Sequence, residues 1–252
     1  MSLFRKKQDV NQNFVNQRRL ILNQNTSFHI QEAYRTLQTN IRFSLTGSGC
    51  KTICLTSSLA SEGKSTTCLN LAISMAETGS RVLLIDGDMR RPSLGRLLIE
   101  KTTPGLSNVL AGLCDVDLAI HNEVRPQLDA LFSGELPPNP LELLSNKSME
   151  DLLKELSAQY DYIIIDTPPV GIVSDACVIA SHTDGVLFLV HQNESDKDSV
   201  SKSVKQLEMS NAKLLGFVLN GVESEKNRRN KGKYRYIYKH KYAYETSGRG
   251  NP

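Results

Sequence analysis

Residues 51–66 read KTICLTSSLASEGKST, and this segment identifies the class of fold. Its first half, 51–57, reads as a buried strand, and its last four letters, GKST, end the phosphate-binding motif called a P-loop. That motif usually begins with glycine, and Ser58 stands at this position here. Because a strand precedes the loop and a helical pattern over 64–78 follows it, a chance GKS sequence in an ordinary turn is the weaker interpretation.

Strands and helices alternate along the rest of the chain. The further strands predicted are 81–86, 128–134, 160–166, 185–190 and 214–220, and the further helices are 27–45, 93–100, 105–112, 140–157, 174–181 and 196–210. Apolar strands that alternate with helices indicate an α/β fold of the P-loop NTPase type, in which helices cover both faces of a mostly parallel sheet. Ligands bind beyond the carboxyl ends of the strands in such a fold.

The composition divides the chain into three parts. Residues 1–27 are polar and rich in Asn and Gln, which predicts a flexible, disordered arm, whereas 28–222 carry the patterns of the P-loop domain. Hydrophobic periodicity ends after Val222, so we expect 223–252 to be a mobile, disordered tail.

Several classes of protein are excluded by composition. No run approaches the ~20 apolar residues that span a bilayer, and no apolar stretch follows the charges at the N-terminus as it would in a signal peptide. The five cysteines form no CxxC pair and have no histidines at zinc-ligand spacing. Reduced thiols in a cytoplasmic protein are therefore expected, rather than disulfides or zinc.

The P-loop predicts a site for ATP and Mg²⁺. Backbone N–H groups of the loop and the positive end of the following helix can surround the phosphates. Lys64 is expected to reach the β and γ phosphates, and the Ser65 hydroxyl to hold Mg²⁺. The residues predicted to bind the nucleotide are Ser58, Glu62, Gly63, Lys64, Ser65 and Thr66.

Two further strands end in acidic residues. Asp86 ends RVLLID and is followed closely by Asp88, and Asp166 ends YDYIIID. Because each carboxylate follows an apolar strand, it must face solvent or a metal ion. Together with Ser65, Asp86 and Asp166 predict a magnesium site with room for a catalytic base. Arg90 and Arg91 are candidates either to neutralise a transferring phosphate or to form salt bridges.

The C-terminal 30 residues combine basic charge with tyrosine. From residue 223 onward there are nine Lys or Arg and three Glu. Five of the eight tyrosines lie within eleven residues of this tail: Tyr234, Tyr236, Tyr238, Tyr242 and Tyr244. An aromatic and basic segment can bind nucleic acid by stacking and charge. Alternatively, beside an ATP site, the hydroxyl groups can be phosphoacceptors.

Three stretches give the sequence a family resemblance. LLIDGDMRRP (83–92), GELPPNPLELL (134–144) and EAYRTLQTNI (32–41) resemble signature motifs of the bacterial tyrosine kinases. The likeness covers roughly 28–222 together with the tyrosine-rich tail. It implies an ATP-dependent enzyme that phosphorylates its own C-terminal tyrosines, in trans between subunits. With that activity in view, Lys64, Asp86 and Asp88 are the predicted catalytic residues, with Asp86 accepting or orienting the tyrosine proton and Asp88 supporting it.

The resemblance also implies partners. The chain is similar to the Gram-positive type, in which a separate transmembrane chain activates the kinase and recruits it to the inner face of the membrane. The setting implied is capsular or exopolysaccharide synthesis and export, with a cognate phosphatase and other protein substrates, and without nucleic acid. The family assembles as a ring through a helix with the pattern Glu-x-x-Arg-x-x-Arg; Glu32 and Arg35 fit this pattern, and Gln38 replaces its last arginine.

The main rival is a partitioning or site-placement ATPase, a P-loop switch without kinase activity. Proteins of that class carry a signature lysine five positions before the P-loop lysine, and Leu59 stands there in this chain. The kinase is therefore the preferred interpretation. Salt-dependent DNA binding without tyrosine phosphorylation would instead favour a nucleic-acid module.

Overall fold

The computed structural model describes residues 16–222; the first part of the predicted arm and the predicted tail, 223–252, lie outside the described residues. A seven-stranded sheet has the order β3-β4-β2-β5-β1-β6-β7. Its strands are β1 (Lys51–Ser57), β2 (Val82–Asp86), β3 (Ile120–Arg125), β4 (Leu128–Leu131), β5 (Tyr162–Asp166), β6 (Gly185–His191) and β7 (Leu214–Asn220). All pairs are parallel except β3 with β4. The predicted α/β fold is confirmed.

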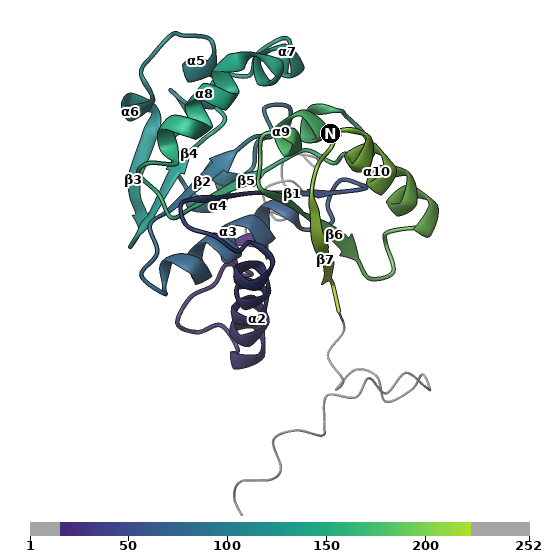
Figure 1. Cartoon of the computed structure of the whole chain (residues 1–252). Helices are drawn as coiled ribbons and strands as arrows, with labels where there is room; N and C mark the ends of the chain where they lie inside the picture. The colour runs from purple at the N-terminus through teal and green to yellow at the C-terminus, as the bar shows by residue number, and fades with distance from the viewer. Residues whose placement is uncertain (1–15, 223–252) are drawn as a thin grey trace, which may run out of the picture. The chain divides into compact units, whose positions relative to one another are not determined.

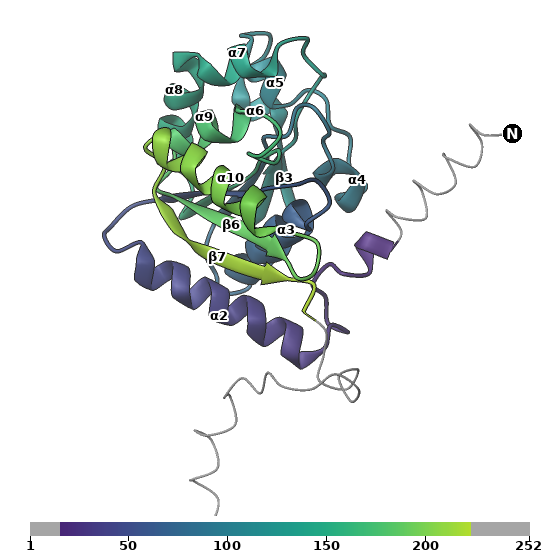
Figure 2. The ribbon, with the colours of Figure 1, turned by 90° about the vertical axis from the view of Figure 1, so that its right-hand side faces the viewer.

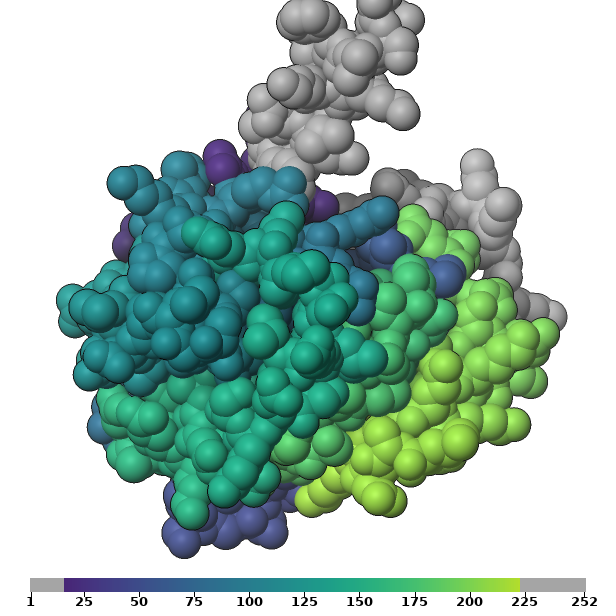
Figure 3. Space-filling model, turned by 90° about the horizontal axis from the view of Figure 1, so that it is seen from above, coloured from purple at the N-terminus to yellow at the C-terminus, as the bar shows by residue number. Residues whose placement is uncertain are grey.

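Helices cover both faces of this sheet (Figure 1). They are α2 (Phe28–Ser44), α3 (Lys64–Ala76), α4 (Leu94–Leu98), α5 (Leu106–Leu110), α6 (Val116–Ala119), α7 (Pro140–Ser145), α8 (Lys147–Leu156), α9 (Asp175–Ser181) and α10 (Lys197–Met209). One face carries α2 and α3, and α2 runs beside β7 in Figure 2. Figure 3 views the opposite face, where the teal segment of α5 to α8 lies beside the green and yellow segment of α9 and α10.

Each face of the sheet has its own apolar core, because successive side chains of a strand point to opposite faces. Ile53 and Leu55 of β1 pack with α2 and α3 on one side, whereas Cys54 between them packs with α8 and α9 on the other. All three side chains are completely buried. A strand that is buried on both faces reads as a continuous apolar run, which is why β1 was recognisable in the sequence.

Three local features differ from the sequence-based expectation. β3 and α6 were not predicted, because β3 (IHNEVR) is a half-exposed edge strand without an apolar run. The helix predicted over 140–157 is two helices, since Asn146 takes an extended conformation (φ −74°, ψ 152°) between α7 and α8. The predicted strand 128–134 ends earlier, at Leu131.

The segment before α2 is packed on the domain. Ile21 and Leu22, which fall in the predicted flexible arm, are 6% and 4% exposed and belong to the core on the α2 and α3 side. Asn70 of α3 holds them through hydrogen bonds to backbone groups of Leu20 and Leu22, of 2.9 and 2.8 Å. The packed chain therefore begins several residues before 28.

Among residues 16–222, no helix is both long enough and apolar enough to cross a bilayer.

Candidate functional site

The P-loop leaves β1 at Ser57 and enters α3 at Lys64, as the motif predicts. The turn depends on Gly63, whose φ of +93° lies in the left-handed region that favours glycine. Lys64 is therefore the first residue of α3, and its backbone N–H belongs to the free, positive end of the helix. This geometry directs backbone donors toward a bound anion.

The Lys64 ammonium group lies within the loop. Its Nζ donates to Ser57 Oγ at 3.0 Å and to the Leu59 carbonyl at 3.3 Å. Burial lowers the pKa of Lys64, and the nearby carboxylates of Asp166 and Asp88 partly offset that effect. A cation held by neutral oxygen atoms in this way is available to a phosphate group that enters the loop.

Asp86 and Asp166 are adjacent, because β2 and β5 are parallel and the two residues are register partners. Both side chains are buried, at 0% and 1% exposure. Asp86 Oδ2 accepts hydrogen bonds from the backbone N–H groups of Ser93 and Leu94, at 3.2 and 3.1 Å. Within residues 16–222, Asp86 Oδ1 and both carboxylate oxygens of Asp166 have no hydrogen-bond partner.

Buried carboxylates without hydrogen-bond partners favour the binding of a cation. Burial, reinforced by the charge of Asp166, raises the pKa of Asp86. Burial also raises the pKa of Asp166 to about 7, although Ser65 and Lys64 act in the opposite direction. Unpaired buried carboxylate oxygens beside a serine hydroxyl form the hard oxygen ligand set that Mg²⁺ prefers. The residues present therefore fit the predicted metal ion.

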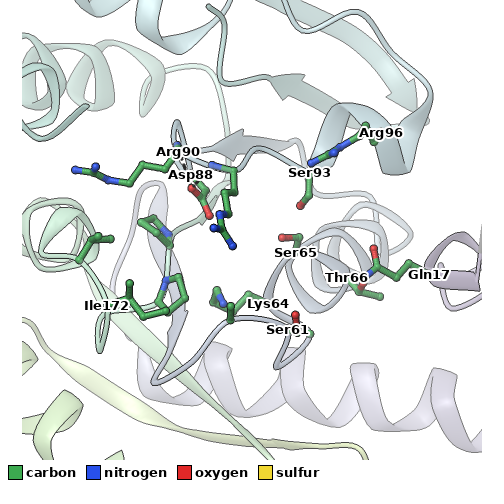
Figure 4. Close-up of a pocket in the computed structure, with 16 residues that line it drawn as sticks. Gln17, Ser61, Lys64, Ser65, Thr66, Asp88, Arg90, Ser93, Arg96 and Ile172 are labelled. Atoms are coloured by element: carbon green, nitrogen blue, oxygen red, sulfur yellow. Dashed lines mark hydrogen bonds between the residues drawn. The ribbon is translucent and has the colours of Figure 1, made fainter. Parts of the chain in front are cut away.

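The phosphate-binding motif borders a pocket of about 520 Å³. Figure 4 shows Lys64 and Ser65 on one side of it and Asp88 on the other. Asp88 Oδ1 accepts hydrogen bonds from the backbone N–H groups of Arg90 and Arg91, at 3.1 and 2.9 Å. Asp86, which is fully buried, is not among the residues that line the pocket.

The two arginines after Asp88 differ in their contacts. Arg90 donates to both carboxylate oxygens of Asp175 in α9, at 2.7 and 3.0 Å, so it is a salt-bridge residue. Arg91 also lines the pocket, and its guanidinium has no side-chain partner among the described residues. Of the two candidates, Arg91 is the one placed to face a phosphate.

Not every predicted binding residue faces the pocket. Gly63, Lys64, Ser65 and Thr66 line it, whereas Ser58 and Glu62 are buried behind the loop, where they bond to each other. The five predicted phosphoacceptor tyrosines lie outside the described residues.

The helix expected to mediate assembly presents only part of its motif. Glu32 and Arg35 form an ion pair of 2.6 Å on the accessible side of α2. Gln38, at 5% exposure, turns inward and donates to Thr78 Oγ1 at 3.0 Å. The residue that replaces the last arginine of the pattern is therefore buried between α2 and the turn that follows α3.

Sequence reasoning missed several contributors to the site, and three of them come from distant parts of the chain. Gln17 lines the pocket in Figure 4, and Ser195 and Asn220 contact the back of the P-loop. These residues lie far from the motif in sequence and carry no pattern of their own, so no local signal could have identified them.

Comparison with known proteins agrees with the geometry. Residues 50–215 match a family model described as an AAA domain. The tyrosine-protein kinase YwqD of Bacillus subtilis is 39% identical over 196 residues, which cover 78% of this chain and 83% of that protein. The kinase domain of the Escherichia coli tyrosine kinase ETK superposes with a TM-score of 0.75 at 32% identity, covering 83% of this chain and 80% of that one.

The rival class is more distant. The septum site-determining protein MinD of Pyrococcus horikoshii, solved with Mg-ADP, has a TM-score of 0.59 at 24% identity and covers 68% of this chain and 70% of that one. This likeness shows a shared fold alone. The extent of the match to YwqD and ETK, together with the P-loop and the two strand-end aspartates, shows that the chain belongs to the bacterial tyrosine-protein kinases.

Proposed function

We propose that this kinase transfers the γ-phosphate of ATP to the tyrosines of its own C-terminal tail, in trans between subunits. The observation that carries the proposal is the pocket lined by Lys64 and Asp88, together with the buried, unpaired carboxylate of Asp166, whose charge acts on Lys64. A P-loop pocket with these groups supports phosphoryl transfer, and the acceptors are the predicted Tyr234, Tyr236, Tyr238, Tyr242 and Tyr244.

The proposed mechanism assigns one task to each group. Loop N–H groups and Lys64 would hold the β and γ phosphates, while Ser65 and Asp166 would hold Mg²⁺, which would neutralise phosphate charge. A tyrosine hydroxyl with a pKa near 10 is protonated at neutral pH, so a carboxylate must accept or orient its proton. Asp88 lines the pocket and is better placed for this than Asp86, which we assign to the metal site.

Electrostatics supports the tail as substrate. Its nine basic and three acidic residues give it a positive charge, which complements a site loaded with ATP. Each phosphate adds about −1.5 to −2 charges, so five of them would add roughly −8 to −10 and reverse the sign of the tail. Phosphorylation would thus weaken any contact that depends on the positive tail.

The proposed setting follows from the family. A separate transmembrane chain would activate the kinase and recruit it to the inner face of the membrane, where it would regulate capsular or exopolysaccharide synthesis and export. A cognate phosphatase would reset the tail. We further propose that Glu32 and Arg35 of α2 contact a neighbouring subunit in a ring.

The test is ATP-dependent phosphotyrosine on the purified chain, with and without a candidate activator segment. Lys64→Met and a five-fold Tyr→Phe tail variant should each abolish the signal, whereas Lys154→Met, on the exposed side of α8, should retain it. Signal that survives in the tail variant would move the acceptors elsewhere. ATP hydrolysis by the activated protein without labelling of any tyrosine would refute the kinase assignment and favour the switch ATPase.

A further inference from the structure

The back of the P-loop, opposite the phosphate pocket, is held by a carboxylate. Glu62 is 1% exposed and turns away from the pocket. It accepts a hydrogen bond from the backbone N–H of Leu59 at 2.8 Å and another from the Ser58 hydroxyl at 3.2 Å. One side chain near the end of the loop therefore fixes the two residues at its beginning.

A serine from a distant part of the chain completes this contact. Ser195, in the turn between β6 and α10, donates from its hydroxyl to Glu62 Oε1. The hydroxyl oxygen of Ser195 in turn accepts a hydrogen bond from the backbone N–H of His191, at the end of β6, at 2.7 Å. Through Ser195, the Glu62 carboxylate is therefore connected to the end of strand β6.

An asparagine at the end of β7 provides a second attachment. Asn220 Nδ2 donates to the backbone carbonyl of Glu62 at 2.9 Å. Its amide lies so close to Gly63 that any side chain at Gly63 would collide with it. The backbone carbonyl of Asn220 in turn accepts a hydrogen bond from the backbone N–H of Gln192 at 2.9 Å. β6 and β7 are neighbours (Figure 2), so both attachments come from the same edge of the sheet.

We propose that Ser195 and Asn220 are positioning residues that act through Glu62 to hold the P-loop in its phosphate-binding shape. None of the three residues lines the pocket, so their contribution is made through the direction of the loop N–H groups. Those donors bind phosphate well only when they are held at the correct angle before the ligand arrives. The inference rests on the proposed phosphate-binding role of the loop, which Mg-ATP binding by the unsubstituted chain tests separately.

The proposal predicts a loss of phosphate affinity that does not depend on the adenine base. Asn220→Ala removes one hydrogen bond from the loop, which corresponds to about a 3- to 10-fold weaker affinity. Because the effect acts through the loop backbone, the affinities for Mg-ATP and for Mg-tripolyphosphate should fall by the same factor. Ser195→Ala should lower the affinity for both ligands in the same way. Both variants should raise KM for ATP, while kcat at saturating ATP stays within about two-fold of the parent value.

Amide hydrogen exchange of the nucleotide-free chain supplies a second measurement. Asn220→Ala and Ser195→Ala should accelerate exchange in peptides that contain 58–63 and leave β2 unchanged, since the loop opens locally when its attachments are removed. The matched controls are Asn40→Ala on α2 and Ser201→Ala on α10, two exposed side chains outside these contacts. Both controls should bind and exchange like the unsubstituted chain.

Two outcomes would overturn the proposal. If Asn220→Ala lowers the affinity for Mg-ATP but leaves the affinity for Mg-tripolyphosphate unchanged, Asn220 acts on the base and not on the loop. If exchange in 58–63 is unaltered in both variants, the contacts do not hold the loop, whatever happens to affinity. If the unsubstituted chain fails to bind Mg-ATP, the phosphate-binding role itself is refuted, and the exchange result still decides whether the attachments fix the loop.

Discussion

Replacement of Asp166 by asparagine should stabilise the nucleotide-free protein at alkaline pH. Asp166 and its register partner Asp86 place two carboxylates side by side, both buried, with three of their four oxygens lacking a hydrogen-bond partner in the described chain. Burial raises the pKa of Asp166 from its usual 3.8 to about 7. Ionisation of this group in the folded state is therefore unfavourable.

The sign and size of the effect follow from linkage. Because the folded pKa is the higher one, stability is fully present below about pH 4, falls as the pH rises toward 7, and is constant above that value. A rise of about three pKa units corresponds to roughly 4 kcal/mol at most. A buried amide that finds no partner costs about 1–3 kcal/mol. Asp166→Asn should thus be about 1–3 kcal/mol more stable than the parent at pH 8.

Thermal unfolding between pH 5 and pH 8 provides the assay. A gain of about 1–3 kcal/mol corresponds to a rise in Tm of about 2–12 °C for a chain of this size, and the gain should shrink toward pH 5. Mg-ATP should raise the Tm of the parent and have little effect on the variant, which lacks the metal carboxylate. Asp151→Asn, on the exposed side of α8, is the matched control. A variant that is less stable than the parent at pH 8, or a difference that does not vary with pH, would refute the reasoning.

Three further predictions concern the surroundings of the site. Arg90→Ala leaves the buried carboxylate of Asp175 without its bidentate partner and should cost about 3 kcal/mol in urea unfolding; additivity with Asp175→Ala in a double-mutant cycle would contradict this coupling. Arg91→Ala should change stability by less than about 0.5 kcal/mol yet lower kcat by about 10- to 100-fold, and an unchanged kcat would remove Arg91 from the mechanism. Gln38→Arg restores the family pattern but buries a charge at the Thr78 contact, so it should destabilise the monomer by about 2 kcal/mol; a more stable ring in sedimentation would show that Gln38 belongs to the subunit interface.

The sequence predicted the central strands well, because strands buried on both faces leave continuous apolar runs. β1 has the predicted bounds. β7 also has them, although it is a partly exposed edge strand, because its sequence LLGFVLN is itself an apolar run. β3 escaped detection because an antiparallel edge strand is half exposed and lacks such a run. The break at Asn146 was hidden because the apolar periodicity of α7 continues into α8 across a single extended residue.

The candidate site was predictable where parallel topology alone brings residues together. Asp86 and Asp166 end neighbouring strands, so their proximity follows from the sheet. The orientation of Glu62 was not predictable, because it depends on Ser195, which is 133 residues away in sequence. The inward position of Gln38 could have been inferred, since it precedes the buried Ile41 by three residues and Leu45 by seven on the same helical face.

The attachment of Asn220 to the P-loop also bears on which subunit phosphorylates which tail. Tyr234 follows Asn220 by only 14 residues. A tyrosine joined to its own catalytic domain by so few residues would, where the linker reaches the pocket, be present there at an effective concentration in the millimolar range. At micromolar protein, free subunits that meet by diffusion cannot compete with such a tether. The proposed transfer between subunits would therefore require an assembly that presents a neighbour's pocket at a comparable local concentration, so labelling in trans and oligomerisation should be lost together.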